Sequence, residues 1–180
     1  RSCFYSGWRK MTDGELSTSI LSTQVEEEDL RAIAEMRAAG SSLSPYIQAR
    51  SKAGYYPPQD HYEALLYRLV TSSTSWLDVG CGLSPFPGND SLAKLLSQRC
   101  CSLTGVDPDE GIKQNEFLQE PHQTSLSELS VETTFDLITA RMVVEHVTDP
   151  ANFASALHRL THPGSVVVFF TVNWWSLTTL

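Results

Sequence analysis

The sequence lacks any stretch that is apolar enough to cross a membrane, because its longest uninterrupted apolar run is only the five residues Val166–Phe170. Residues 1–10 hold charges and aromatics instead of an apolar segment before a small-residue cleavage site, so we expect no secretory signal. Positive charge is scarce: 13 Lys and Arg residues against 21 Asp and Glu residues leave a formal net charge of −8. Such an acidic chain repels phosphate backbones, so nucleic acid is a disfavoured partner. We expect a single soluble, cytoplasmic domain.

Cysteine is also rare in the 180 residues. The four cysteines, Cys3, Cys81, Cys100 and Cys101, show neither the paired spacing of a metal site nor the density of a disulfide framework. We therefore expect four reduced thiols. Cys81 lies inside a glycine turn, where we interpret it as a small polarisable filler, because no His or Asn is placed to activate it as a nucleophile.

The N-terminal third of the chain predicts a helical cover. The first 25 residues are rich in Ser and Thr and indicate a loose arm. Residues 26–40 predict an amphipathic helix, with acids in the first turn, an apolar stripe and a terminal glycine. Residues 41–58 predict a loop that ends at two prolines, and residues 59–70 predict a second helix.

Beyond Ser75, short apolar runs alternate with helical segments, a pattern typical of βαβ units. The expected strands lie at 76–79, 102–106, 121–125, 135–140 and 165–171, and the expected helices at 90–99, 109–119 and 150–160. We predict an α/β fold with a Rossmann-like, open, mostly parallel sheet of order 3-2-1-4-5 and helices on both faces. Residues 1–58 form the N-terminal arm and cover in this interpretation, and residues 59–180 form the core.

The last predicted strand lies at an edge of this sheet. It is rich in Val and Phe, and an unpaired apolar edge promotes association between chains. We therefore expect either that the protein continues beyond Leu180 with further C-terminal strands or that another element covers this edge, and we favour continuation. We also expect that the chain can self-associate through this edge.

Two of the predicted strands end on an acid. Asp78 precedes Gly80-Cys81-Gly82, and Asp107 follows Gly82 by 25 residues. Glycines allow a ligand to approach the backbone closely, and an acid beside them suits a cationic ligand rather than a phosphate. S-adenosylmethionine, a positively charged sulfonium compound, is the ligand that this arrangement favours.

The order of these motifs resembles that of class I S-adenosylmethionine-dependent methyltransferases, in particular the quinone and small-molecule enzymes, over about residues 55–175. The matching segments are Leu77–Gly82, Gly105–Asp107, Phe135–Val147 and His162–Ser165. Together they are a specific signal, although a Gly-x-Gly alone is not. The resemblance implies an enzyme of the EC 2.1.1 class that moves a methyl group to an O, N or C atom of a small-molecule acceptor by in-line displacement.

The resemblance also implies roles for individual residues. The glycine turn passes under the methionine portion and ribose, and Asp107 accepts hydrogen bonds from both ribose hydroxyls; the alternative is an acid that opens the next helix. Asp78 lies near the ammonium group or orders the turn through water, unless it is a buried capping acid. The implied cofactor-binding set is Asp78, Gly80, Cys81, Gly82, Asp107, Pro108, Ser125, Leu126, Ala140 and Arg141.

Residues after the fourth strand bear on metal binding and on proton transfer. Some related enzymes hold a divalent metal through Glu-x-x-Glu-His at this point, but this chain has Met142 in place of the first Glu. Glu145 and His146 alone make a poor magnesium site, so we predict no metal. His146 is our candidate catalytic base, because imidazole exchanges protons near neutral pH. The alternative is a histidine that only orders the loop.

Two departures keep other functions open. The third glycine common in the family is Ser84 here, and the loop after it is rich in proline. Because the C-terminus is short and the third glycine is missing, a non-catalytic, methyltransferase-like binding module remains the main alternative. A nicotinamide dinucleotide enzyme is disfavoured, because its fingerprint needs glycine where Pro85 stands, and because Asp78 would bring negative charge near the pyrophosphate.

Overall fold

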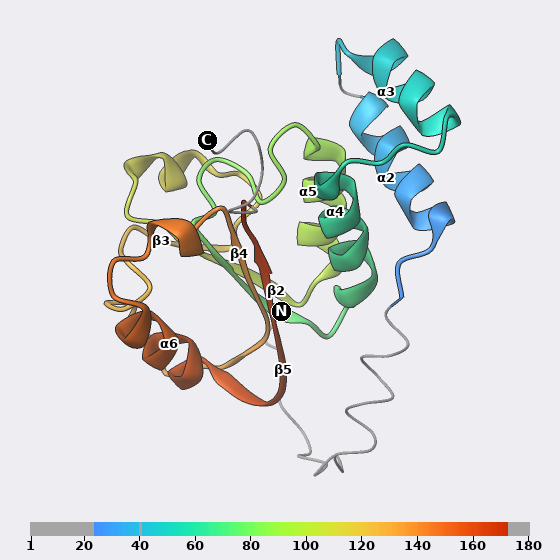
Figure 1. Ribbon diagram of the computed structural model, residues 1–180. Coiled ribbons are helices and arrows are strands. Elements are labelled where there is room, and N and C mark those ends of the chain that lie inside the picture. The colour runs from blue at the N-terminus through green and yellow to red at the C-terminus, as the bar shows by residue number, and fades with distance from the viewer. Residues whose placement is uncertain (1–23, 40, 173–180) are drawn as a thin grey trace.

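The computed structural model of the protein describes residues 24–39 and 41–172, and within these ranges five strands form one open sheet (Figure 1). Every neighbouring pair is parallel, and the order is β3-β2-β1-β4-β5. The predicted Rossmann-like sheet of order 3-2-1-4-5 is confirmed. The arm predicted for the first 25 residues lies outside the described residues, apart from Gln24 and Val25. The strands are β1 (Ser75–Val79), β2 (Ser102–Val106), β3 (Glu120–His122), β4 (Phe135–Arg141) and β5 (Thr161–Phe170).

Helices cover both faces of this sheet, as predicted. Figure 1 shows α4 (Pro58–Leu69) and α5 (Asp90–Arg99) on one side and α6 (Pro150–Arg159) on the other. Helix α2 (Glu27–Ala39) contacts both α4 and α5. None of the helices in the described part of the chain combines the length and the apolar character that a membrane span requires.

Side-chain caps fix the starts of two helices. Asn89 Oδ1 accepts a hydrogen bond from Leu92 N at 3.3 Å at the start of α5. Asp149 Oδ1 accepts one from Asn152 N at 3.0 Å at the start of α6. Pro150 follows in the first turn of α6, where the missing N–H has no helical partner in any case. Both predicted starts are confirmed.

One segment predicted as a loop is helical. Within residues 41–58 the structure has α3 (Ser44–Lys52), with Pro45 in its first turn. Only Ile47 of this helix is buried, so its sequence has no apolar stripe that periodicity could reveal. The segment before α4 therefore contains two helices, α2 and α3.

One predicted helix is mostly absent. Residues 109–119 were expected to be helical, but only the short 3-10 turn η1 (Glu110–Gln114) forms. Asn115 ends this turn, because its side chain accepts a hydrogen bond from Phe117 N at 3.1 Å and donates one to Gly82 O at 3.0 Å. A local side-chain interaction thus competes successfully with helix propagation.

Two strand boundaries also differ from the prediction. The third strand was expected at residues 121–125, whereas the edge strand β3 comprises only Glu120–His122. The fifth strand, expected to begin at Ser165, already begins at Thr161 and includes Pro163 and Gly164. Its pairing with β4 is irregular between Phe135 and Leu137, which accommodates the proline at the edge of the sheet.

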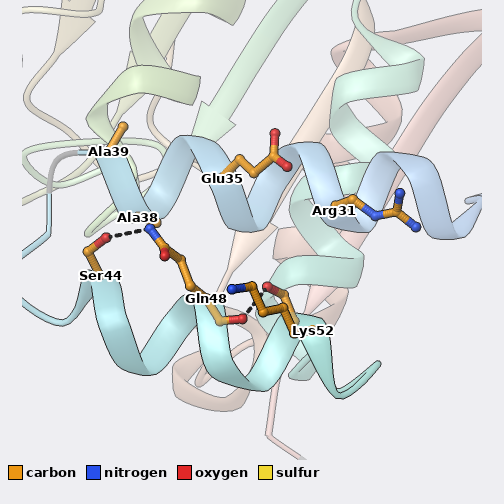
Figure 2. A pocket seen from close by; sticks show the side chains of 8 residues that line it. Arg31, Glu35, Ala38, Ala39, Ser44, Gln48 and Lys52 are labelled. Atoms are coloured by element: carbon orange, nitrogen blue, oxygen red, sulfur yellow. Dashed lines mark hydrogen bonds between the residues drawn. The ribbon is translucent and has the colours of Figure 1, made fainter.

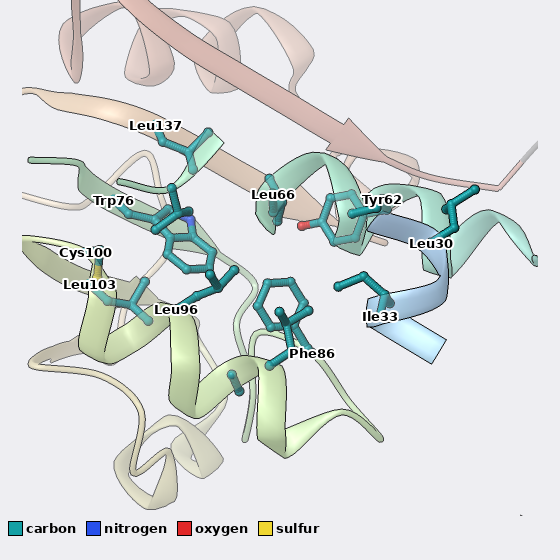
Figure 3. Close-up of a cluster of buried hydrophobic side chains, with 14 residues drawn as sticks. Leu30, Ile33, Tyr62, Leu66, Trp76, Phe86, Leu96, Cys100, Leu103 and Leu137 are labelled. Atoms are coloured by element: carbon teal, nitrogen blue, oxygen red, sulfur yellow. The ribbon is translucent and has the colours of Figure 1, made fainter. Parts of the chain in front are cut away.

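A hydrophobic core lies between the sheet and helices α4 and α5 (Figure 3). Trp76, Phe86 and Leu66 are completely buried there. The ring of Phe86 lies 5.9 Å from that of Trp76 and 6.4 Å from that of Tyr62, measured between centroids. Burial of one such side chain contributes on the order of 2–3 kcal/mol. Phe86 belongs to the loop after the glycine turn, so core packing holds that loop in place.

The cysteines differ from the expectation in one respect. Cys81 and Cys100 are free and buried, which agrees with the expectation that their thiols are reduced. Cys101, however, is disulfide-bonded, so the expectation of four reduced thiols is wrong for this residue. A low cysteine density alone does not exclude a single disulfide.

Candidate functional site

The carboxyl ends of β1 and β2 bring the two strand-end acids to one edge of the sheet. Asp78 of β1 lies opposite Gly105 of β2, and Val79 lies opposite Val106. The N–H of Gly80 continues this pairing by donating to Val106 O at 2.8 Å. Parallel strands place both of their carboxyl ends at the same edge, which is where α/β sheets bind ligands.

The glycine turn after β1 needs backbone angles that favour glycine. Gly80 has φ +69° and Gly82 has φ +48°. A Cβ atom on Gly80 would collide with the Cγ2 atom of Val143, whereas a Cβ atom on Gly82 would meet no atom within 4 Å. The first glycine therefore allows close packing, and the second one faces open space in which a ligand can approach the backbone.

Asp107 is tied to this turn by backbone hydrogen bonds. Its Oδ2 atom accepts from Gly82 N at 2.9 Å, and its Oδ1 atom accepts from Asp109 N at 2.8 Å. A carboxylate has about four acceptor sites, so two remain for donors of a ligand. The bond to Asp109 also shows that Asp107 orders the start of the following segment, which was the alternative role considered for it.

Asp78 lies beneath the turn and is only 3% exposed. Thr139 Oγ1 donates a 2.6 Å hydrogen bond to its Oδ1 atom, and Trp76 Nε1 donates to the same threonine hydroxyl at 2.7 Å. The pKa of Asp78 is raised to about 7, mainly by burial and to a smaller extent by the nearby charge of Asp107, while the hydrogen bond from Thr139 and the charge of Arg141 oppose the shift. The carboxyl group of Asp78 therefore gains or loses its proton near neutral pH.

A cavity of about 330 Å³ opens at the same edge of the sheet, between the ends of β1 and β2 and the start of α6. It brings together five predicted site residues: Gly80, Pro108, Ser125, Leu126 and His146. The residues that line it are Val79, Gly80, Val106, Pro108, Thr124, Ser125, Leu126, Ser127, Val143, His146, Val147, Thr148, Asp149, Asn152 and Phe153.

Apart from His146 of η2 (Val144–His146), sequence reasoning missed the wall of this cavity that Val143 and the first turn of α6 provide. Val143, Asn152 and Phe153 belong to that wall. The predicted cap at Asp149 located the start of α6, but no sequence pattern indicated that its first turn would face the cavity.

Two predicted cofactor contacts have side chains that point into the protein. The thiol of Cys81 packs against Gly105, because its sulfur would lie only 2.7 Å from a Cβ atom placed on that glycine. Burial raises the pKa of this thiol. Ala140 is completely buried and lies opposite Val79 in the sheet. Only backbone atoms of these two residues are available to a ligand. Arg141 follows at the end of β4 and is half-buried.

The candidate base His146 is an exposed residue of the cavity wall. The neighbouring Glu145 accepts a 2.9 Å hydrogen bond from Thr171 Oγ1 through its Oε2 atom. Within residues 24–39 and 41–172, no group of three or more His, Cys, Asp or Glu side chains could hold a metal ion. The absence of a metal from the mechanism stays a prediction.

Met142, directly after β4, has an unusual backbone conformation with φ +55°. Its N–H donates to Phe170 O at 2.6 Å, which holds the strained residue against β5. β-branched residues tolerate this region poorly, whereas Asn tolerates it well. We expect Met142→Ile to lower the free energy of unfolding by about 1–2 kcal/mol. Urea unfolding would measure the loss, with Met142→Asn as the control; equal stability of the two variants would contradict the strain.

A second hollow, of about 580 Å³, lies between α2 and α3. Figure 2 shows Arg31 and Glu35 of α2 on one side of it, and Gln48 and Lys52 of α3 on the other. Most of the residues that line it have polar side chains, and none of the predicted site residues lines it. The site that the sequence predicted is therefore the edge of the sheet and not this hollow.

The comparisons with known proteins agree with this geometry. A family model described as a methyltransferase domain matches residues 30–177. A protein of Pseudomonas paraeruginosa named ubiquinone biosynthesis O-methyltransferase is 32% identical over 107 residues, which are 54% of this chain and 44% of that protein. The protein of the same name in Pseudomonas syringae pv. tomato is 33% identical with the same coverage. The chain thus spans somewhat less than half the length of these curated relatives.

A solved structure with a similar fold is that of the plantazolicin methyltransferase BpumL in complex with S-adenosyl-L-homocysteine (SAH). The TM-score is 0.50 with 19% identity, over 82% of this chain and 62% of that one. At this identity the likeness concerns the fold alone.

Proposed function

Because the chain belongs to the methyltransferase domain family, whose model covers residues 30–177, we propose that it is an S-adenosylmethionine-dependent methyltransferase. We place the cofactor across the carboxyl ends of β1 and β2, with Asp107 at its ribose. One observation carries this proposal: the two strand-end acids share an edge of the sheet, with Asp78 opposite Gly105 and with Asp107 hydrogen-bonded to Gly82 N at 2.9 Å.

The residues at this edge fit the cofactor chemically. The open space at Gly82 accommodates a ligand against the backbone, and the acids complement a sulfonium and a ribose diol. Pro108 and Leu126 give the cavity apolar walls that suit adenine, and Ser125 adds a hydroxyl. Arg141, at the end of β4, suits the carboxylate of the methionine portion. We therefore retain the whole predicted set in this proposal, with Cys81 and Ala140 acting through their backbone.

When bound, S-adenosylmethionine supplies a methyl group that is already activated by the positive sulfur. The chain mainly has to hold the acceptor in line with this methyl group, since orientation alone accounts for several kcal/mol of barrier reduction. The methyl group would pass to the acceptor atom as the carbon–sulfur bond breaks, with SAH as the leaving product. We propose that His146, at the cavity wall, takes the proton that an acceptor hydroxyl or amine releases.

We propose a small-molecule acceptor, and a hydroxyl as its reactive group, because the curated relatives carry the name O-methyltransferase. A further cavity, of about 470 Å³ between α4 and β5, supports an acceptor that contains a ring. Its walls include Tyr56, Tyr62, Phe169 and Phe170. Aromatic walls of this kind bind flat apolar groups well.

Three further proposals concern the whole protein. We retain the division into a cover at residues 1–58 and a core at residues 59–180. Self-association through the β5 edge is supported by Val167 and Phe169, which are 36% and 48% exposed. We also retain a cytoplasmic location, although the disulfide at Cys101 would be unusual in a reducing compartment.

Calorimetric titration of the purified chain tests the proposed cofactor. S-adenosylmethionine and SAH should bind, and NAD should not. Binding of NAD alone would refute the methyltransferase proposal. Binding of none of the three would favour the non-catalytic interaction module that the sequence left open.

Replacement of Asp107 should weaken cofactor binding strongly. In Asp107→Ala the ribose loses its charged acceptor, at a cost of about 1.5–3 kcal/mol, which corresponds to a roughly tenfold to 150-fold higher Kd for SAH in calorimetry. The matched control is Asp136→Ala. Asp136 Oδ2 also accepts a backbone hydrogen bond, from Ser75 N at 2.8 Å, but at the amino ends of the strands. Unchanged SAH affinity in Asp107→Ala would exclude the ribose role.

A further inference from the structure

Four charged side chains, two of them completely buried and two mostly buried, join helices α2 and α3 to α4. Asp60 and Glu63 of α4 are completely buried, and the side chains of Arg37 of α2 and Arg50 of α3 are each 13% exposed. Arg37 Nε donates to Asp60 Oδ1 at 3.1 Å, and Arg50 Nη2 donates to Asp60 Oδ2 at 3.0 Å. Arg37 Nη2 lies 2.6 Å from Glu63 Oε1 in an ion pair. Two positive and two negative groups make the cluster neutral, as burial requires.

Glu63 extends this cluster to the loop behind the glycine turn. Its Oε2 atom accepts a hydrogen bond from Asn89 Nδ2 at 2.7 Å, and its Oε1 atom accepts one from Gln59 Nε2 at 2.8 Å. Asn89 is 2% exposed, and its Oδ1 atom caps α5 by accepting from Leu92 N. One amide group therefore joins the carboxylate of α4 to the start of α5.

Short-range hydrogen bonds continue from Asn89 to the glycine turn. Asn89 N donates to Phe86 O at 2.8 Å, and Phe86 N donates to Ser84 Oγ at 3.2 Å. Ser84 lies two residues after Gly82, whose N–H is bonded to Asp107 Oδ2. A displacement of Asn89 would thus shift the turn and the carboxylate of Asp107 together.

We propose that Glu63 and Asn89 are positioning residues for cofactor binding and that Arg37 holds Glu63 in the required orientation. This inference rests on the proposed binding of S-adenosylmethionine at Asp107. Arg37 is the cation that faces the buried carboxylate of Glu63, so this ion pair fixes the place of the Glu63 side chain. The cover helices thereby contribute to the affinity of a cavity that they do not line.

The test measures the Kd for SAH by calorimetry on the whole chain. Asn89→Ser keeps an oxygen that can cap α5 but is too short to reach Glu63, so we expect α5 to persist and the Kd to rise about five- to tenfold. Glu63→Gln keeps the buried volume and removes the charge, and a smaller rise of about threefold is expected. The double variant should bind no more weakly than Asn89→Ser, because both substitutions act on one contact.

The matched control is Arg68→Met, which removes another ion pair between α4 and α2. Arg68 Nε lies 2.6 Å from Asp29 Oδ2 and has no contact with the glycine-turn loop in this network. We expect a lower melting temperature and an unchanged Kd. The positioning role is overturned by unchanged SAH affinity in both Asn89→Ser and Glu63→Gln, or by an equal loss of affinity in Arg68→Met. If the unmodified chain does not bind SAH, the proposed function itself fails, and this inference with it.

Discussion

Asp78→Asn should stabilise the ligand-free protein at pH 8 while weakening its affinity for a cationic cofactor. The buried carboxyl has a pKa of about 7 in the folded protein and an ordinary value near 3.8 in the unfolded chain. A difference of this size corresponds to about 4 kcal/mol that the folded state loses when the group ionises. Asparagine has nearly the same shape, can still accept the hydrogen bond from Thr139, and carries no charge.

The pH dependence gives this prediction its sign. Because the folded pKa is the higher one, the unfolded chain releases this proton first as pH rises. The contribution of Asp78 therefore reduces stability between about pH 4 and pH 7, and the reduction is complete above the folded pKa. Urea unfolding at pH 5, 6, 7 and 8 should show the gap between Asp78→Asn and the unmodified protein growing with pH.

At pH 8 the loss of negative charge at residue 78 should raise the Kd for S-adenosylmethionine at least tenfold. An Asp78→Asn protein that is no more stable than the unmodified one at pH 8 would show that the buried carboxylate is well accommodated by Thr139 and Arg141.

Gly80→Ala should be the most damaging single substitution in the glycine turn. Alanine at this position would have to adopt φ +69°, and its Cβ atom would collide with Val143 Cγ2. The left-handed backbone costs about 1–2 kcal/mol, and overpacking against a fixed side chain adds about 1–3 kcal/mol. We expect thermal unfolding to show a loss of about 2–5 kcal/mol and SAH binding to become undetectable.

Two further variants separate these two costs. Gly54→Ala is the control for the backbone alone, because Gly54 has φ +71° and no atom within 4 Å of a Cβ position. The double variant Gly80→Ala with Val143→Ala removes the collision and should recover part of the lost stability. Equal losses in Gly80→Ala and Gly54→Ala would mean that Val143 moves aside and that the turn does not depend on close packing.

The strands and their order could be predicted because their signals are local. Apolar runs that are buried on both faces and bounded by glycine, proline or caps define β1, β2 and β4 almost to the residue. The two acids at strand ends were predictable for the same reason: once the strands are parallel and adjacent, Asp78 and Asp107 must share an edge. Asp149-Pro150 marked the start of α6 through cap chemistry alone.

The parts that the sequence did not reveal depend on contacts between distant segments. Helix α3 buries only Ile47, so it depends on its packing against α2 and on Arg50, which reaches Asp60 of α4. The ion pair of Arg37 with Asp60 joins residues 23 positions apart, and no spacing rule predicts such a pair. In the segment after Asp109, side-chain hydrogen bonds of Asn115 end the turn, although the sequence pattern predicts a longer helix.

A crystal structure of the chain with SAH would test the central claim most directly. We predict that the ribose hydroxyls lie within hydrogen-bond distance of Asp107, that the adenine fills the cavity beside Pro108 and Leu126, and that the homocysteine portion follows Gly80–Gly82. SAH bound elsewhere, such as in the hollow between α2 and α3, with the glycine turn left free, would contradict the account.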